Sequence, residues 1–466
     1  MCVDTKRFDL CIRNGTVITS NDTFKADVGI SRGKVTQIGK VQRAKRDIDA
    51  SGLYVMPGAI DTHTHLDMPS GDIFTTDDFE SGTIAAVAGG VTTLIDFAVQ
   101  LEGMSLTDTL AVWKAKAAEK AIIDYSFHLA ITKWDDSFRE EIGLLVQEGV
   151  TSFKAFMAYK GSLMLDDAAL FLLLQAAQEH QAMVLIHAES GDAIHVLQGQ
   201  ALARGDRSPE FHALTRPPLL EGEATSRAIA FAKITGTALF IVHVSCEAAL
   251  EPIRAAQERG FPIFAETCPQ YLGAISNKEY SRPGFEGAKF VCSPPLRDEK
   301  EAQALWAGIR RGNLQTIGSD HCPFSMDQKR LGEHDFTRIP NGIPGIETRV
   351  PLTWTLGVGR GFITPNQFVD LIATKPARLF GLPHKGDLKV GFDADIMVFD
   401  PELEVTITNE RLHQQSDYTP YEGFRCRGYP VFTISRGECV WENGTSTAKP
   451  GRGQWQRRVA GNYGAS

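Results

Sequence analysis

Two histidines separated by one residue, His63 and His65, directly follow an apolar run that reads LYVMPGAI. On a β-strand, residues i and i+2 point to the same face and lie about 6–7 Å apart. Two imidazoles in that arrangement can bind the same metal ion. An isolated pair of this kind more often binds no metal, so further ligands are needed to support a metal site.

Further candidate ligands stand at the ends of other apolar runs. His187 ends the run AMVLIH, His243 ends ALFIVH, and Asp320 ends LQTIGSD. Each residue alone is explained as well by a buried histidine or by a helix-capping aspartate. Because the C-terminal ends of barrel strands face the active site, four histidines and one aspartate at such positions together indicate a metal centre. Neutral imidazole and carboxylate suit zinc, and a water molecule completes a catalytic site.

A lysine, Lys154, lies inside the apolar run TSFKAFMAY. A buried ammonium is costly unless it is paired or neutralised, and a metal dication would repel it. A side chain that carries its charged end to solvent is the simpler explanation for this residue taken alone. Beside the histidines we favour a carbamate, formed from the neutral amine and carbon dioxide. A carbamate is anionic, and its two oxygens can bridge two metal ions.

The elements that must position these residues alternate between short apolar runs and helical stretches. VTTLIDFAV precedes LTDTLAVWKAKAAEKA, and ALFIVHVS precedes CEAALEPIRAAQERG, within a repeat that covers roughly 300 residues. This repeat predicts an α/β fold with a (β/α)8 TIM-like barrel over residues 54–383. A doubly wound open sheet is the alternative, and the lack of GxGxxG after a first strand weakens it.

Both ends of the chain have the alternating pattern of short β-strands instead. The pattern is found in FDLCIRNGTVIT near the start and in GDLKVGFDADIMVFDPELEV and YPVFTISRGECVWENG near the end. Because chain ends commonly lie close together, we expect residues 1–53 and 384–445 to form one small sheet domain. Residues 446–466 are polar and rich in glycine, and we expect them to form an extended tail.

The composition excludes several classes of protein. The chain has 466 residues, of which 43% are apolar and 23% charged, as in a globular protein. A net charge of −9 without basic clusters argues against nucleic-acid or membrane partners. No apolar run reaches the ~18 residues that span a bilayer, and the first residues lack a secretory signal. The eight cysteines have no CxxC spacing, so we expect reduced thiols and a cytoplasmic protein.

Eight motifs taken together resemble the cyclic amidohydrolases, and the nearest group is that of the dihydropyrimidinases and D-hydantoinases. The motifs are, in the family's order, PGAIDTHTH, GGVTTLIDFA, SFKAFMAYKG, IHAESGD, IVHVSCEAALE, ETCPQYL, CSPPLRD and GSDHCPFS. The resemblance extends from about Phe8 to Arg458. It implies a barrel with a small β-sandwich domain built from both chain ends.

The resemblance also implies a binuclear metal centre with two Zn²⁺ ions, although Mn²⁺ or Co²⁺ suits the same ligands. One ion would be held by His63, His65 and Asp320, and the other by His187 and His243. Carbamylated Lys154 and a hydroxide would bridge the two ions.

The activity implied is hydrolytic ring opening of cyclic ureides, with dihydropyrimidines such as dihydrouracil, or 5-substituted hydantoins, giving N-carbamoyl amino acids. The bridging hydroxide would attack a ring carbonyl, with Asp320 as general base and then general acid. Tyr159 would stabilise the oxyanion. The family pattern further places substrate-binding positions at Ser293 and Asn341, and lid positions at Leu66, Phe156 and Leu163. Leu163, where some relatives have an aromatic residue, would leave room for a large ring substituent.

Related functions remain as alternatives. A dihydroorotase commonly has an arginine where this chain has Asp67, which would repel an anionic substrate. Allantoinases generally lack the tyrosine that corresponds to Tyr159, and mononuclear deaminases need no lysine such as Lys154. A non-enzymatic interaction protein of the same fold would have lost metal ligands, which this chain keeps. The family commonly forms homotetramers in which the tail reaches a neighbour, so we expect a homotetramer or a homodimer.

Overall fold

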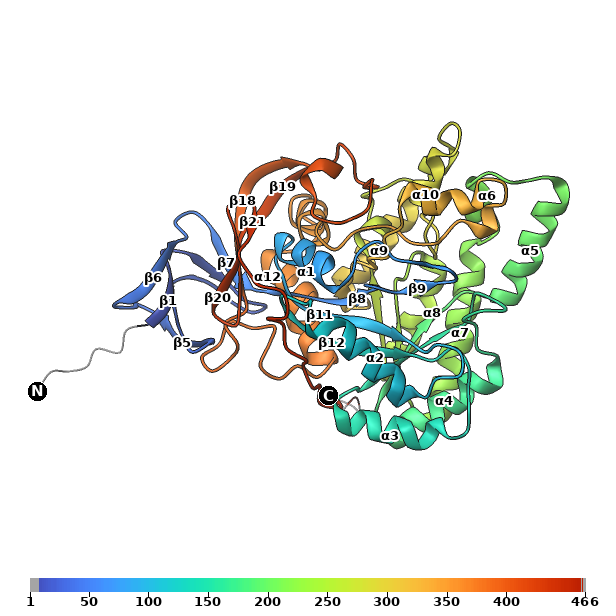
Figure 1. The fold of residues 1–466 in the computed structure, drawn as a ribbon, viewed down its shortest axis with the longest axis horizontal. Helices are drawn as coiled ribbons and strands as arrows, with labels where there is room; N and C mark the ends of the chain where they lie inside the picture. Colours follow the sequence, from blue (N-terminus) through green and yellow to red (C-terminus); the bar gives the residue numbers. More distant parts are fainter. Residues whose placement is uncertain (1–7, 462, 464–466) are drawn as a thin grey trace, which may run out of the picture.

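An eight-stranded parallel sheet forms the centre of the structure, a computed structural model that describes residues 8–461 and 463 (Figure 1). Its strands, in spatial order, are β17 (Thr316–Ile317), β16 (Ile263–Thr267), β15 (Leu239–Ile241), β14 (Met183–His187), β13 (Ser152–Phe156), β12 (Asp124–Ala130), β11 (Val91–Val99) and β8 (Ala59–Thr64). A parallel bridge between Thr64 and His321 brings the two ends of the sheet together. The α/β prediction is confirmed: the sheet is curled as in a TIM-like barrel.

Several helices pack against the outside of this sheet. The α-helices of the described chain are α1 (Phe79–Ala88), α2 (Leu106–Ala118), α3 (Phe138–Glu148), α4 (Asp167–Glu179), α5 (Gly191–Arg204), α6 (Glu210–Leu214), α7 (Pro218–Thr235), α8 (Glu247–Gln257), α9 (Glu299–Arg311), α10 (Met326–Lys329), α11 (Arg349–Thr353), α12 (Pro365–Val369) and α13 (Lys375–Leu379). Aspartates set several helix starts, since Asp78, Asp166 and Asp298 each accept hydrogen bonds from the first-turn N–H groups.

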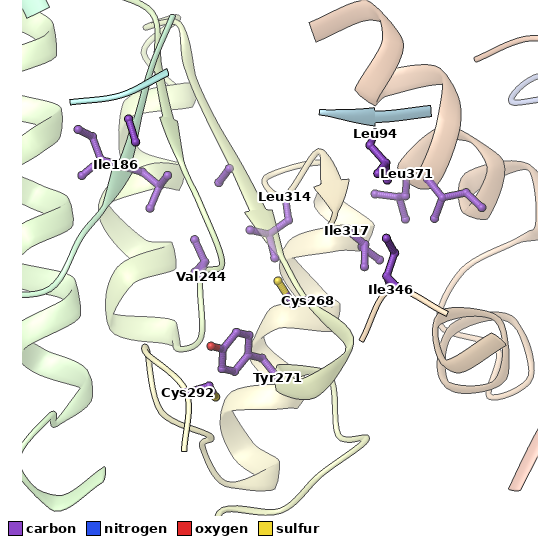
Figure 2. Packing of buried hydrophobic residues seen from close by; sticks show 14 of the residues in the cluster. Leu94, Ile186, Val244, Cys268, Tyr271, Cys292, Leu314, Ile317, Ile346 and Leu371 are labelled. Atoms are coloured by element: carbon purple, nitrogen blue, oxygen red, sulfur yellow. The ribbon is translucent and has the colours of Figure 1, made fainter. Parts of the chain in front are cut away.

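The strands are buried along almost their whole length because both sheet faces are covered. Every residue of β11 is buried, as expected for a parallel strand between a packed interior and outer helices. Figure 2 shows Leu94 of β11 close to Ile317 of β17 and to Leu371. The helical segment Asp370–Thr374 contacts both β8 and β17, so it covers the seam where the two edge strands approach each other.

Two further sheets lie at the chain ends, one built from N-terminal strands alone and one from strands of both ends. One contains β5 (Lys34–Gly39), β4 (Asp27–Ser31), β1 (Phe8–Arg13) and β6 (Ala44–Asp49). The other contains, in order, β21 (Thr445–Ser446), β20 (Glu438–Glu442), β19 (Arg425–Ser435), β18 (Ile396–Thr406), β7 (Tyr54–Pro57), β2 (Thr16–Ile18) and β3 (Thr23–Lys25). Figure 1 shows these blue and dark red strands side by side. A small two-stranded sheet, β9 (Pro69–Ser70) with β10 (Ile73–Phe74), stands apart near the barrel.

The described part of the C-terminal tail packs on its own barrel. Tyr125 of β12 donates its N–H to Gln454 O at 3.1 Å, and the Arg458 N–H donates to Gly149 O at 3.0 Å. The Arg458 side chain is buried and donates to Ser152 Oγ at 2.7 Å. The tail is therefore tied to the start of strands β12 and β13 of its own chain.

The remaining sequence expectations concern thiols and membrane segments. The described cysteines are buried, and the structure shows them as free thiols, while Cys2 lies outside the described residues. Among the helices the structure describes, none has the length and apolar character to cross a membrane.

Candidate active site and metal centre

The six predicted metal ligands lie within about three residues of the C-terminal ends of five strands. His63 is on β8 with His65 just beyond it, and Lys154 is on β13. His187 ends β14, while His243 and Asp320 follow β15 and β17 within three residues. All six side chains line one cavity of about 400 Å³. The structure thus brings together every residue of the predicted set.

One group of donor atoms surrounds Asp320. Its Oδ1 lies 3.1 Å from His63 Nε2 and 3.4 Å from His65 Nε2, and the three donor atoms all lie within 4.8 Å of one another. His63 Nδ1 lies 2.6 Å from Oε1 of the buried Glu266 on β16, which turns His63 Nε2 toward Asp320. Burial alone would raise the pKa of Asp320, but the charge of His63 and hydrogen bonds from both histidines hold that pKa well below its ordinary value.

The second group contains His187 and His243, whose ring centres lie 4.6 Å apart. His187 Nε2 lies 2.7 Å from Glu189 Oε2, which also accepts a hydrogen bond from Arg216 Nη1 at 2.7 Å. His243 Nδ1 is buried without a hydrogen-bond partner among the described residues. Burial lowers the pKa of both histidines, so both rings are neutral, as metal binding requires. An orphaned buried nitrogen in a neutral ring fits a metal site.

Lys154 lies near both groups, since its charge acts on the pKa of His65 in the first and of His187 in the second. Its side chain is 1% exposed, and its Nζ lies 5.2 Å from the ring centres of both Phe97 and Phe156. No hydrogen bond or ion pair joins this Nζ to another residue of the described chain. Burial lowers the pKa of Lys154 from its ordinary value of 10.5 to about 7. A substantial fraction of this amine is therefore neutral near physiological pH.

Tyr159 and Ser293 lie on the same side of the cavity. Tyr159 follows β13 in a left-handed conformation with φ of 67°, and its ring centre lies 5.1 Å from that of His187. The Arg216 guanidinium lies 5.6 Å from the Tyr159 ring centre. Burial raises the pKa of Tyr159, which therefore keeps its hydroxyl proton and can donate it in a hydrogen bond. Ser293 and Asn341 also line the cavity, and Asn341 Oδ1 is buried without a partner among the described residues.

The predicted lid residues do not share one position. Phe156 and Leu163 line the cavity, but Leu66 is absent from its walls. Leu66 is fully buried and packs under α1, where a Cβ at Gly82 would lie 2.4 Å from its Cδ2. Leu66 therefore belongs to the packing between β8 and α1 in this structure, which gives no support to its predicted contact with the ring substituent.

Asp67 does not face the substrate space either. It adopts φ of 50°, does not line the cavity, and its Oδ1 lies 3.8 Å from Lys116 Nζ. The repulsion that we assigned to Asp67 therefore does not act inside the cavity. What remains of the argument against an anionic ring substrate is the absence of an arginine at this position.

Comparison with known proteins places this geometry in a family. The sequence matches the amidohydrolase family over residues 54–440. The chain belongs to the amidohydrolase family. It is 48% identical over 459 residues to a D-hydantoinase of Geobacillus stearothermophilus, with 97% of each chain covered. It is 43% identical over 453 residues to a D-hydantoinase of Ralstonia pickettii, with 97% of this chain and 99% of the relative covered.

Solved structures agree with this assignment. The crystal structure of a dihydropyrimidinase from Brevibacillus agri matches this amidohydrolase with a TM-score of 0.95 and 47% identity, over 97% of this chain and 99% of that one. An L-hydantoinase (dihydropyrimidinase) from Arthrobacter aurescens matches with a TM-score of 0.89 and 31% identity, over 97% and 100% of the two chains. The similarity therefore covers the barrel and both chain ends.

The donor set of this amidohydrolase fits the metal dependence of its family. The donor atoms of His63, His65 and Asp320 converge. The ring of His243 lies beside them, with its centre 5.3 Å from that of His63, and its Nδ1 has no hydrogen-bond partner among the described residues. We therefore regard this amidohydrolase as a metal-dependent hydrolase.

A second acidic cluster in this amidohydrolase has a structural explanation. Asp124, Asp393 and Asp395 also lie close enough to hold an ion. Lys385 Nζ, however, lies 2.8 Å from Asp124 Oδ2, 3.3 Å from Asp393 Oδ2 and 2.6 Å from Asp395 Oδ2. One buried ammonium thus pairs with all three carboxylates, so this cluster needs no metal ion to balance its charge.

Sequence reasoning assigned no role to the residues that orient the ligands. Glu266 and Glu189 stand inside the motifs ETCPQYL and IHAESGD, and Arg216 stands outside all eight motifs. Buried carboxylates beside an apolar run are the signal that could have identified the two glutamates, because an ionised group is buried only with a partner. Arg216 carries no such local signal, since its contacts come from distant parts of the chain.

Proposed function

We propose that this enzyme hydrolyses cyclic ureides and opens 5,6-dihydropyrimidines or 5-substituted hydantoins to N-carbamoyl amino acids. The observation that carries the proposal is the convergence of His63, His65, Lys154, His187, His243 and Asp320 on one cavity. The cavity also has apolar walls, including Phe156 and Leu163, that suit a ring substituent. Identities of 43–48% to D-hydantoinases over nearly the whole chain support the substrate class.

The proposed cofactor is a pair of Zn²⁺ ions, for which Mn²⁺ or Co²⁺ can substitute. His63, His65 and Asp320 would hold one ion, and His187 and His243 the other. Lys154 would join both as a carbamate, formed when its neutral Nζ attacks carbon dioxide, makes one N–C bond and releases one proton. The burial of Lys154 without an acidic partner among the described residues supports this role.

When bound, the metal pair would lower the pKa of a water molecule and polarise the ring carbonyl. The chain's own residues would then move the protons. Asp320, held ionised, accepts the proton of the attacking water on its carboxylate and returns it to the ring nitrogen as the C–N bond breaks. Tyr159 donates its hydroxyl hydrogen to the oxyanion that develops on the former carbonyl.

We also propose the predicted domain organisation, with a β-sandwich from residues 1–53 and 384–445, a barrel from 54–383 and a tail from 446–466. Support comes from the buried cluster that joins Leu10 and Ile12 of one terminal sheet to Val55 and Ile396 of the other. A homotetramer or homodimer is the proposed assembly.

A panel of rings tests the function directly. The zinc-loaded protein is incubated with dihydrouracil, hydantoin, 5-phenylhydantoin, allantoin and dihydroorotate, and loss of the ring is followed by chromatography. We expect turnover of dihydrouracil or of the hydantoins, and none of the last two compounds. If every ring stays closed while two metal ions are bound per chain, the metal centre stands and the substrate class is wrong.

The residues of the cavity wall lead to a narrower prediction about which ring substituents the enzyme accepts. Because Leu163 leaves more room than an aromatic residue would, we expect a higher kcat/KM for 5-phenylhydantoin than for unsubstituted hydantoin. A Leu163→Trp variant is expected to remove that preference while keeping activity on hydantoin. Equal kcat/KM values of the natural enzyme for the two rings would contradict the proposed role of Leu163.

Replacing Tyr159 by phenylalanine is expected to lower kcat by about 10²–10³-fold, the usual effect of losing one oxyanion donor. KM and metal content should change little, because the ring of residue 159 still packs beside His187. Steady-state kinetics measure the effect, and Tyr54→Phe on β7 is the matched control, since Tyr54 packs against Trp354 away from the cavity. An unchanged kcat would remove Tyr159 from the proposed chemistry.

A further inference from the structure

Lys329, at the end of α10, is fully buried and takes no part in the chemistry proposed above. Its Nζ donates to three main-chain carbonyls: Val291 O at 2.9 Å, Pro340 O at 2.6 Å and Gly342 O at 2.8 Å. The three hydrogens of an ammonium are thus all used. Among the residues the structure describes, no acidic side chain forms an ion pair with Lys329.

The three carbonyls belong to two loops that meet at the cavity. Val291 stands two residues before Ser293, and Pro340 and Gly342 flank Asn341. Ser293, Pro340, Asn341 and Gly342 all line the cavity. One direct main-chain hydrogen bond, from Gly342 N–H to Val291 O at 3.0 Å, also joins the two loops. Lys329 therefore supplies most of the hydrogen bonds at this junction.

The chemistry of a buried ammonium points to a geometric role. Burial lowers the pKa of Lys329, because the charged form loses its hydration and has no acid beside it, while the three carbonyl acceptors favour the ammonium over the neutral amine. An apolar side chain of similar length would fill the same space without that cost. What only the ammonium can supply is a three-way link between carbonyls that lie far apart in the sequence.

The cavity side of the junction has one unsatisfied polar atom. Asn341 Oδ1 is buried and has no hydrogen-bond partner among the described residues. A cyclic ureide presents ring N–H donors and carbonyl acceptors in one plane. Such a ring needs several protein groups at fixed separations, so the relative position of the two loops decides how well it binds.

We propose that Lys329 is a positioning residue that holds the Ser293 and Asn341 loops in register for the ring of the substrate. The inference rests on the proposed function, since Ser293 and Asn341 are the substrate-binding positions that the family resemblance predicts for it. Neither loop carries a proposed metal ligand. Lys329 thus acts on substrate binding and leaves the metal centre unchanged.

Lys329→Met tests the inference, because methionine fills the space and removes all three donors. We expect kcat/KM for the best ring of the panel to fall about 10²-fold, mainly through KM, as for a small displacement of binding groups. Metal content should stay at the natural level. Lys329→Gln, which keeps two N–H donors, should give an intermediate KM. Lys289→Met is the matched control: Lys289 pairs with Glu286 and does not line the cavity, so its kinetics should not change.

Hydrogen exchange provides a readout that does not need turnover. In Lys329→Met, amide exchange should accelerate in residues 291–297 and 339–343, and remain unchanged in β13 and β14. Unchanged exchange there, or an unchanged KM in a folded variant, overturns the inference and leaves the proposed function intact. If the natural enzyme opens no ring of the panel, the proposed function fails, and the exchange experiment still decides whether Lys329 holds the loops.

A crystal structure decides the case in which Lys329→Met does not fold. The natural enzyme is crystallised with a hydantoin analogue that cannot be hydrolysed. Main-chain groups of Ser293 and Asn341 should lie within hydrogen-bond distance of the ring, with the Lys329 contacts retained. A ring bound elsewhere in the cavity overturns the inference.

Discussion

Replacing Lys154 by alanine is expected to abolish metal binding and ring opening together. Five other donors remain in the variant, but Lys154 of β13 is the residue proposed to join the two metal ions. Lewis-acid stabilisation by bound metal is worth several kcal/mol, and each ~1.4 kcal/mol is tenfold in rate, so kcat should fall at least about 10³-fold. Elemental analysis after gel filtration gives metal content, and the ring panel gives the rate.

Chemical rescue separates a bridging carboxylate from a packing role. Acetate or propionate can occupy the space that Lys154 leaves and present the same two oxygens as a carbamate. We expect these acids to restore part of the metal content and part of the activity of Lys154→Ala. Lys160→Ala is the control, because Lys160 is exposed and pairs with Asp192. Full metal content in Lys154→Ala without added acid would exclude the bridging role.

The positions of the proposed ligands were predictable because strand ends are readable from sequence. An apolar run such as MVLI can be recognised as a buried strand, and the polar residue that ends it must stand at the sheet edge. His187 ends β14 and His243 follows β15 by two residues, as the runs indicated. Parallel strands then bring these ends together without further information.

Side-chain direction in the loops was not predictable in the same way. Leu66 and Asp67 follow His65 directly, yet Leu66 turns under α1 and Asp67 turns toward Lys116. The left-handed backbone at Asp67, with φ of 50°, ends the alternation of the strand. The period of two residues therefore still holds for His65 and Leu66 just beyond β8, and it fails at Asp67, where the backbone is no longer extended.

Contacts between segments that lie far apart in the chain could not be predicted from the sequence either. Lys329 joins carbonyls of Val291 and Gly342, and Arg216 joins Glu189 to the Tyr159 ring. Each pairing depends on how loops fold over the strand ends, and no local pattern records that geometry. The same holds for the tail, where Arg458 enters the base of the barrel beside Ser152.

Asp320 has two proposed roles, as a metal ligand and as the group that accepts and returns the proton. Two substitutions separate these roles. Asparagine keeps one oxygen that can bind metal but cannot accept the proton of the attacking water. Asp320→Asn is therefore expected to keep much of the metal and to lose about 10²–10⁴-fold in kcat, the range of general acid–base catalysis. Asp320→Ala removes the oxygen as well, so we expect a larger loss of kcat together with loss of the metal held by His63 and His65.

The control for both variants is Asp192→Asn, an exposed carboxylate at the start of α5 whose partner is Lys160. Metal content and kcat are measured for all three proteins under the same loading conditions. Since His63 and His65 hold the pKa of Asp320 well below its ordinary value, its carboxylate is ionised near neutral pH, the state that a metal ligand and a proton acceptor must both have. Near-natural kcat in a metal-replete Asp320→Asn would therefore assign the proton transfer to another group, because the amide cannot replace the carboxylate in that step.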